Sequence, residues 1–320
     1  MTDTATADWP DLPYGAWKET CSTLHLWTQV VGKIRLAQTP WQNHSWHVPL
    51  YLTTRGLTTS PIPHGSRSFE ILFDFVGHVL IIRVSNGAER KFDLRPRSVA
   101  EFYGMVMASL ADLGVPVAIT AYPCEIAGAI PFNGDHQHAA YDADYANRFW
   151  RVLLQVDRVL KQFRTGFIGK CSPVHFFWGS FDLAVTRFSG RRAPPFIGKV
   201  PGLATAVMQE AYSHEVSSAG FWPGGNGMDA SFYSYAYPQP AGFRDVAVQP
   251  RQAFFSETLG EFLLPYDAVR KEADPDASLL AFCQSTYEAA ARTANWDRST
   301  LEYPQGSPGP WPDVKAADTG

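Results

Sequence analysis

Apolar residues recur at three- and four-residue spacing in four segments of the chain, which predicts four long helices. Ser98, followed three residues later by Glu101, has the spacing of a capping box and marks the start of the second helix. We expect Asp142 or Asp144 to cap the third helix and Asp276 to cap the fourth. The predicted helices span residues 14–36, 98–114, about 142–163 and about 276–294.

Shorter segments with alternating apolar and polar residues, or with many β-branched and aromatic residues, are typical of strands. They cover residues 45–57, 68–75, 78–85, 90–94 and 115–120 in the first part of the chain, and 173–188, 212–221, 231–237 and 254–264 in the second. Asn86-Gly87 separates two of these segments, and this pair favours a type I′ turn, so we expect a hairpin there. Residues 124–144 lose the pattern and predict an irregular connection.

The order helix, several strands, helix occurs twice along the chain, and this repetition predicts the fold class. We expect an α+β protein with two similar halves, each a mostly antiparallel sheet with helices, packed as one compact pseudo-symmetric unit. The predicted boundaries are 9–123 for the first half, 124–143 for the connection and 144–302 for the second half, with flexible tails at 1–8 and 303–320. Chance recurrence of the same element order is the alternative to a duplication.

Composition and charge narrow the class of protein. The chain has 320 residues, of which 45% are hydrophobic, and this excludes disorder as its main state. Its 27 basic and 31 acidic residues give a net charge of −4, so nucleic acid is not an expected partner. The first residues carry no signal segment and no run of about 18 apolar residues occurs, which predicts a cytoplasmic protein with no membrane partner. The four cysteines lie far apart and indicate neither a disulfide framework nor a zinc site.

Three segments carry a resemblance to a known family. They read NHSWHVPLYLTTRGLTTSPIP, SPVHFFWGSFDLAVTRFSGRRAPP and YSHEVSSAGFWPGG. They resemble a bacterial family known only as a domain of unknown function, and the resemblance extends roughly from Trp9 to Glu302. It implies a family and no activity, so every candidate role below rests on the residues themselves.

The predicted strands bring basic side chains onto common faces. Residues separated by an even number share one face of a strand, so His47, Tyr51 and Arg55 are expected to lie together. His175 and Arg187 share parity in the second half, provided that no bulge intervenes. Two His and two Arg on equivalent faces would form a positive floor suited to a carboxylate or phosphate.

Structural roles are the alternative for these side chains. Arginines on strands often form ion pairs with a neighbour such as Asp74 or Asp182, and histidines on strands are often satisfied core groups. Trp178 and Trp222 are candidates for the aromatic wall of a binding pocket, although a core of this size also needs aromatic residues. The sequence leaves both roles open.

A second cluster combines His214 and Glu215 with the glycine-rich residues 220–225. His and Glu can act as general bases, and a glycine-rich turn frees backbone N–H groups to bind an anion. Neighbouring residues on a strand point to opposite faces, so only one of the two enters a given pocket. A purely structural strand end is the alternative.

Other chemistries have weaker signals. The candidate metal ligands are His44 and His47 together with His175 or His214, if the fold brings them close to one another. No ligand spacing requires this, so we predict no metal, and the cofactor stays unknown. His136 and His138 are expected to lie in a solvated loop. Ser180 and Cys171 are nucleophile candidates by residue type only, because no G-x-S-x-G turn surrounds them.

These features together favour a small-molecule enzyme. We expect His47, His175, His214 and Glu215 to provide acid-base chemistry in a pocket between the halves. An anionic or aromatic substrate would contact the binding residues Arg55, Arg187, Tyr51, Trp178 and Trp222. A non-catalytic binding or sensor domain is the first alternative, and a structural or partner-binding protein of unknown oligomeric state is the second. A His close to a carboxylate and a shifted pKa in a cleft would favour the enzyme.

Overall fold

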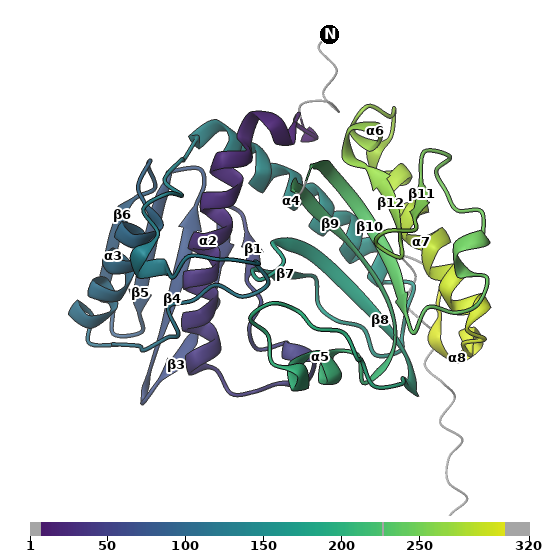
Figure 1. Cartoon of the computed structure of the whole chain (residues 1–320), viewed down its shortest axis with the longest axis horizontal. Helices are drawn as coiled ribbons and strands as arrows, with labels where there is room; N and C mark the ends of the chain where they lie inside the picture. Colours follow the sequence, from purple (N-terminus) through teal and green to yellow (C-terminus); the bar gives the residue numbers. More distant parts are fainter. Residues whose placement is uncertain (1–7, 226, 305–320) are drawn as a thin grey trace, which may run out of the picture.

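The computed structural model describes residues 8–225 and 227–304 of the chain. This part contains seven α-helices and two antiparallel sheets of six strands each (Figure 1). The prediction of an α+β fold with two sheet-based halves is therefore confirmed. Apart from Asp8, Tyr303 and Pro304, the two tails that the sequence predicts to be flexible lie outside the described residues.

The first sheet has the strand order β1-β2-β4-β5-β6, and β3 pairs with a second part of β4. Its strands are β1 (Tyr51–Thr53), β2 (Gly56–Thr58), β3 (Ile62–His64), β4 (Arg67–Asp74), β5 (Val79–Val84) and β6 (Glu89–Asp93). Helix α3 (Val99–Asp112) packs on this sheet through Phe102, which stacks on Phe73 at a centroid distance of 6.1 Å. The Ser98 hydroxyl accepts a hydrogen bond from the Glu101 N–H at 3.2 Å, and the Glu101 carboxylate accepts one from the Ser98 N–H at 3.1 Å. The predicted capping box is confirmed.

The second sheet has the strand order β11-β12-β10-β9-β8-β7. Its strands are β7 (His175–Phe177), β8 (Asp182–Arg192), β9 (His214–Gly225), β10 (Met228–Tyr237), β11 (Phe254–Ser256) and β12 (Glu261–Pro265). The helices of this part are α4 (Ala143–Arg164), α5 (Thr205–Ala211), α6 (Tyr266–Arg270), α7 (Pro275–Thr293) and α8 (Arg298–Leu301). Helices α4 and α7 cover one face of the sheet (Figure 1). Asp142 caps α4, as one of two predicted candidates, whereas Asp274 and not Asp276 caps α7.

Helix α2 (Tyr14–Gln38) runs between the two sheets (Figure 1). It contacts α3 and β3 of the first half, and α4, β9 and β10 of the second. Residues 20–35 of the helix contain no exposed position, so polar side chains such as Gln29 and Arg35 are enclosed along with the apolar ones. A helix covered on every side must find partners for its polar groups inside the protein.

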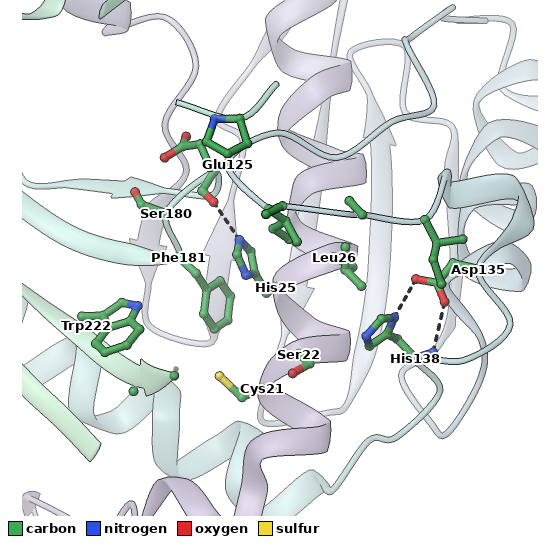
Figure 2. Close-up of a pocket in the computed structure, with 18 of the residues that line it drawn as sticks. Cys21, Ser22, His25, Leu26, Glu125, Asp135, His138, Ser180, Phe181 and Trp222 are labelled. Carbon is green, nitrogen blue, oxygen red and sulfur yellow. Dashed lines mark hydrogen bonds and ion pairs between the residues drawn. The ribbon is translucent and has the colours of Figure 1, made fainter. Parts of the chain in front are cut away.

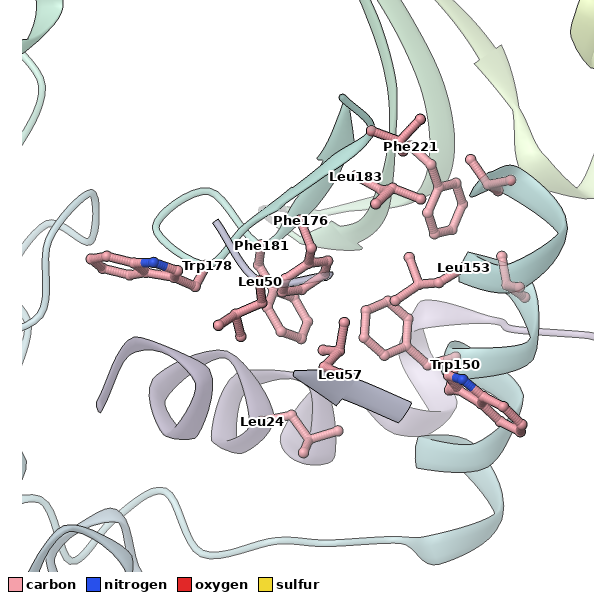
Figure 3. Packing of buried hydrophobic residues seen from close by; sticks show 14 of the residues in the cluster. Leu24, Leu50, Leu57, Trp150, Leu153, Phe176, Trp178, Phe181, Leu183 and Phe221 are labelled. Atoms are coloured by element: carbon pink, nitrogen blue, oxygen red, sulfur yellow. The ribbon is translucent and has the colours of Figure 1, made fainter. Parts of the chain in front are cut away.

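One hydrophobic cluster joins the two halves. Leu50 and Phe176 exchange two backbone hydrogen bonds of 2.9 and 3.0 Å, which link the first half to β7. Figure 3 shows Leu24 and Leu57 of the first half packed in the same cluster as Phe176 and Leu153 of the second. The prediction that the halves pack as one unit agrees with this shared core.

The segment 45–57 is not one strand. It contains β1 and β2, joined by a tight turn in which the Thr53 hydroxyl accepts hydrogen bonds from the N–H groups of Arg55 at 3.2 Å and Gly56 at 3.0 Å. Arg55 lies in this turn, and His47 lies before β1 begins. The expected common strand face for His47 and Arg55 is therefore wrong, because a threonine side chain closes the turn.

The segment 173–188 is also interrupted. Strands β7 and β8 form a hairpin, and His175 pairs with Ala184 across it. Arg187 lies three residues beyond Ala184 on β8, and strand residues alternate between faces. His175 and Arg187 therefore lie on opposite faces of the second sheet, and the parity prediction for this pair is wrong because the hairpin turn intervenes.

Three smaller predictions need correction. A hairpin follows Asn86-Gly87 as predicted, but only Gly87 has a positive φ, of +89°. The turn is thus not type I′, and the side-chain Oδ1 of Asn86 instead accepts a hydrogen bond from the Ala88 N–H at 3.0 Å. Residues 115–120 form no strand, and residues 254–264 form the hairpin of β11 and β12.

Pseudo-symmetry between the halves is not confirmed. In the first sheet the last strands follow chain order, with β4, β5 and β6 side by side. In the second sheet β12 pairs with β10, and β11 lies outside it at the edge. Helix α5, between β8 and β9, has no counterpart in the first half among the described residues.

We predict opposite effects for the same substitution at two helical glycines. A Cβ atom at Gly32 of α2 would lie 2.2 Å from the Trp178 ring, whereas nothing lies within 4 Å of a Cβ at Gly104 of α3. Gly32→Ala should therefore destabilise the protein by about 1 to 3 kcal/mol despite its better helix propensity. Gly104→Ala should stabilise it by about 0.5 to 1 kcal/mol. Urea unfolding of both variants measures this, and a shift of both midpoints in one direction would contradict the packing argument.

Candidate functional site

A cavity of about 570 Å³ lies where α2, the connection after Pro123, the β7–β8 turn and the end of β9 meet (Figure 2). Its volume is in the range of small-molecule sites. In Figure 2, Glu125, Ser180 and Trp222 lie on one side of α2, and Asp135 and His138 lie on the other. The cavity therefore extends across the surface of this helix.

Glu125 presents an unusual carboxyl group to the cavity. Its backbone has a positive φ of +62°, and its N–H donates a hydrogen bond to the Pro201 carbonyl at 2.7 Å. Its Oε1 lies so close to Gly179 that a Cβ there would be 1.9 Å from it. Burial, and then the charge of Asp182, raise the pKa of Glu125 to about 7. Within the described residues no donor contacts this carboxyl group.

Two side chains of α2 hold the loops on this side of the cavity. Gln29 donates to the Cys124 carbonyl at 2.8 Å and accepts from the Cys124 N–H at 2.9 Å. His25 Nε2 donates to the Gly179 carbonyl at 2.8 Å, and burial lowers the pKa of His25 to about 4. The neutral His25 ring stacks on Phe181 at 4.9 Å and so forms a fixed wall.

Asp182 is the second buried carboxyl group near the cavity. It accepts hydrogen bonds from the hydroxyls of Ser180 and Tyr233. Burial raises the pKa of Asp182, while the two donated hydrogen bonds favour its charged form. Glu125 receives no such bonds, so nothing among the described residues offsets the burial that raises its pKa to about 7.

Asp135 and His138 form a hydrogen-bonded couple on the other side of α2. The Asp135 side chain accepts from His138 Nδ1 at 2.8 Å, and it also accepts from the N–H groups of Gln137 and His138, each at 3.1 Å. Asp135 is 1% exposed. His136 is exposed, as the prediction of a solvated loop has it, and His138 is partly exposed. Asp135 is buried, because the connection folds against α3 and the cavity. The carboxylate holds the proton on Nδ1 and leaves Nε2 as the acceptor.

Aromatic side chains complete the wall near the end of β9. Trp222 and Tyr14 both line the cavity. A Cβ at Gly225 would lie 2.7 Å from the Trp222 ring, and one at Gly224 would lie 2.9 Å from the Tyr14 ring. The glycine-rich end of β9 therefore makes room for the two rings, which is a different role from anion binding.

A second cavity of about 180 Å³ lies on the face of the second sheet that α4 and α7 do not cover. Ser180 lines both cavities. Hydroxyl groups cover the floor of the smaller one: the Tyr212 hydroxyl donates to that of Tyr235 at 3.2 Å, and Thr186 and Ser218 are 2.9 Å apart. This face is polar, whereas the opposite face of the sheet packs on α4 and α7.

Two of the predicted site histidines, His47 and His175, are buried. His47 Nδ1 accepts from the Gln42 N–H at 3.1 Å, and its ring packs on Trp41. His175 is fully buried among aromatic rings, and neither ring nitrogen has a hydrogen-bond partner within the described residues. Burial lowers the pKa of His175 to about 3. Neither histidine lines the cavity at Glu125.

The predicted arginines have structural partners. Arg55 forms an ion pair with Asp74 at 2.8 Å, which is the structural alternative for this residue. The Arg187 guanidinium lies over the ring of Phe163 at 3.5 Å and that of Tyr287 at 4.3 Å. Burial lowers the pKa of Arg187 to about 10, and it is fully buried on the helix-covered face.

The other predicted site residues are dispersed. His214 Nδ1 lies 3.0 Å from the Ser213 hydroxyl, and Glu215 forms an ion pair with Arg191 at 2.7 Å. The Arg35 guanidinium lies 5.2 Å from the centre of the Tyr51 ring, and the Trp178 N–H donates to the Val48 carbonyl at 2.8 Å. Trp222 alone among the nine predicted residues lines the 570 Å³ cavity in the part of the chain that the structure describes. The structure does not bring the nine together.

Sequence reasoning missed the groups that do line the cavity. Glu125 lies in a segment without regular structure, and His25 lies inside a predicted helix. The spacing of Asp135 and His138, three residues apart beside a glycine, was the one available signal of a couple. Only the fold brings these groups together.

The geometry defines an α+β protein with two sheets and a 570 Å³ cavity lined by acidic and aromatic side chains. The chain belongs to a family of unknown function, DUF5996, whose family model matches residues 9–303. No curated protein and no solved structure matches the chain. In the part that the structure describes, no helix has both the length and the apolar character to cross a membrane, and no three His, Cys, Asp or Glu side chains are grouped to hold a metal ion.

We predict that Glu125→Gln changes how stability depends on pH. The pKa of Glu125 is raised to about 7 in the folded protein, so the unfolded chain releases this proton at lower pH. The contribution of Glu125 to stability is then fully present below about pH 4.5 and is lost as the pH rises through about 7. Relative to wild type, the glutamine variant should gain about 1 to 3 kcal/mol between pH 4.5 and 7.5.

Urea unfolding at several pH values tests this prediction. The difference between variant and wild type cancels the contribution of Glu261, whose pKa burial also raises to about 7. Glu257→Gln is the matched control, because Glu257 is exposed and pairs with Arg244 at the surface. Parallel stability curves for wild type and Glu125→Gln would rule out a raised pKa at Glu125.

Proposed function

We propose that the 570 Å³ cavity is the active site of a small-molecule enzyme that uses acid-base chemistry. One observation supports this most: a carboxyl group that titrates near neutrality and a histidine oriented by a buried carboxylate line the same cavity. Groups of these two kinds are what proton transfer at neutral pH requires. A histidine close to a carboxylate and a shifted pKa in a cleft favour an enzyme over a binding domain.

Each group has a distinct role in this proposal. Glu125 takes up or releases a proton at the substrate, and burial together with the negative charge of Asp182 keeps its affinity for that proton high. His138 accepts a proton at Nε2, while Asp135 holds Nδ1 and stabilises the imidazolium that forms. Ser180 and Tyr233 keep Asp182 in place by their hydrogen bonds.

A non-catalytic binding or sensor domain is the alternative. The aromatic wall of Trp222 and Tyr14 favours it, because such rings bind ligands without chemistry. The two functions differ in their outcome. An enzyme returns a changed compound, whereas a binding domain returns the same compound.

Turnover by purified variants tests the proposed function. Wild-type protein is incubated with a metabolite extract, and mass spectrometry identifies compounds that disappear and those that form. We expect Glu125→Gln and His138→Asn to slow that conversion by about 100- to 10,000-fold, which is the usual contribution of an acid-base group. Both variants should remain folded, because the glutamine and asparagine keep the shape of the side chains.

The matched controls are Glu257→Gln and His136→Asn. Both residues are exposed and neither lines the cavity, so the conversion should keep its wild-type rate. A compound that binds in the cavity but is recovered unchanged from wild type would contradict the enzyme and favour the binding domain. Equal rates for wild type and both cavity variants would contradict the assigned roles.

A further inference from the structure

The charge of the cavity wall is one-sided. Among the described residues that line it, none is Lys or Arg, whereas Glu125 and Asp135 are acidic. A third carboxyl group, that of Asp182, accepts a hydrogen bond from the Ser180 hydroxyl. After burial, its charge is the second cause that raises the pKa of Glu125. An anion that entered this cavity would meet these carboxyl groups and, among the described lining residues, no Lys or Arg to offset them.

The Glu125 carboxyl group has no hydrogen-bond donor among the described residues, whereas the carboxyl groups of Asp135 and Asp182 both have donors. Asp135 accepts three hydrogen bonds and Asp182 accepts two from neighbouring groups. Glu125 accepts none within the described residues, and it rests against the Cα of Gly179. A partly buried carboxylate without a donor is costly, so a ligand that donates hydrogen bonds there gains the most.

An aromatic face lies on the same side of α2. Trp222 lines the cavity on the side where Glu125 and Ser180 lie (Figure 2). The Phe181 ring is covered on both faces, by His25 at 4.9 Å and Phe149 at 5.1 Å, so it is not available to a ligand in the same way. The face of a tryptophan attracts a cation within about 6 Å of the ring.

We propose that the cavity binds a small organic cation, whose ammonium group donates hydrogen bonds to Glu125 and lies against Trp222. This inference rests on the proposed active site and names the substrate class for it. It replaces the anionic substrate that the sequence favours, because the arginines behind that expectation lie outside the cavity. A proton can then pass from the ammonium nitrogen to the Glu125 carboxylate, which leaves a neutral amine and a carboxylic acid.

Three compounds of similar shape test the charge preference: 2-phenylethylamine, 2-phenylethanol and phenylacetate. Their dissociation constants are measured by calorimetry at neutral pH with the full chain. We expect the amine to bind at least about tenfold more tightly than the alcohol, and phenylacetate to bind more weakly than both. Tighter binding of phenylacetate than of the amine would overturn the inference, as would failure of all three compounds to bind at millimolar concentration.

Two substitutions test whether Glu125 and Trp222 cause the preference for the amine over the alcohol. Glu125→Gln should remove the advantage of the amine over the alcohol, and Trp222→Leu should reduce it several-fold. Glu257→Gln and Trp41→Leu are the matched controls and should keep it, because both residues are exposed and lie outside the cavity. A preference that persists in Glu125→Gln would overturn the inference.

The result is separable from that of the turnover experiment. Turnover of a neutral or anionic compound that depends on Glu125 and His138 would retain the proposed function and overturn the cation inference. Selective binding of the amine without turnover would retain the cation inference and contradict the enzyme.

Discussion

The side chain of Gln29 fixes the place where the connection between the halves crosses α2. It pairs with both the N–H and the carbonyl of Cys124, as a neighbouring strand would. Gln29 is fully buried, so its amide must be satisfied by the protein, and the irregular connection supplies the partners. Glu125 follows directly in the chain, and its positive φ directs the carboxyl group into the cavity. The site thus depends on one amide in the central helix.

The same helix also positions the adjoining wall, on the same side of the cavity. His25, one turn before Gln29, donates to the carbonyl of Gly179 in the β7–β8 turn. Phe181 in this turn has a positive φ of +60°, which costs a non-glycine residue about 1 kcal/mol or more. Two strained residues, Glu125 and Phe181, are therefore held against one helix. Backbone strain and an acid with a raised pKa at one place are typical of sites retained for function at some loss of stability.

The parts of the fold that follow from local chemistry could be predicted from the sequence. The caps at Ser98 and Asp142 are examples, because side chains satisfy backbone groups two or three residues away. The turn at Thr53 also has a local cause, but its threonine resembles a strand residue, so the break went unpredicted. The site could not be predicted, because Gln29 and Cys124 lie 95 residues apart and only the packed fold joins them.

The second sheet separates charge between its two faces. Arg187 lies on the face that packs against α4 and α7, where aromatic rings surround its guanidinium. Asp182 lies five residues earlier on the same strand and so on the opposite face, with Ser180 and Tyr233 as donors. The sequence predicted that Arg187 would bind a ligand, but its guanidinium lies inside the core, where aromatic rings stabilise it. Asp182 remains on the other face, where it lines the smaller cavity. The alternation along β8 therefore places the two charges on opposite sides of the sheet.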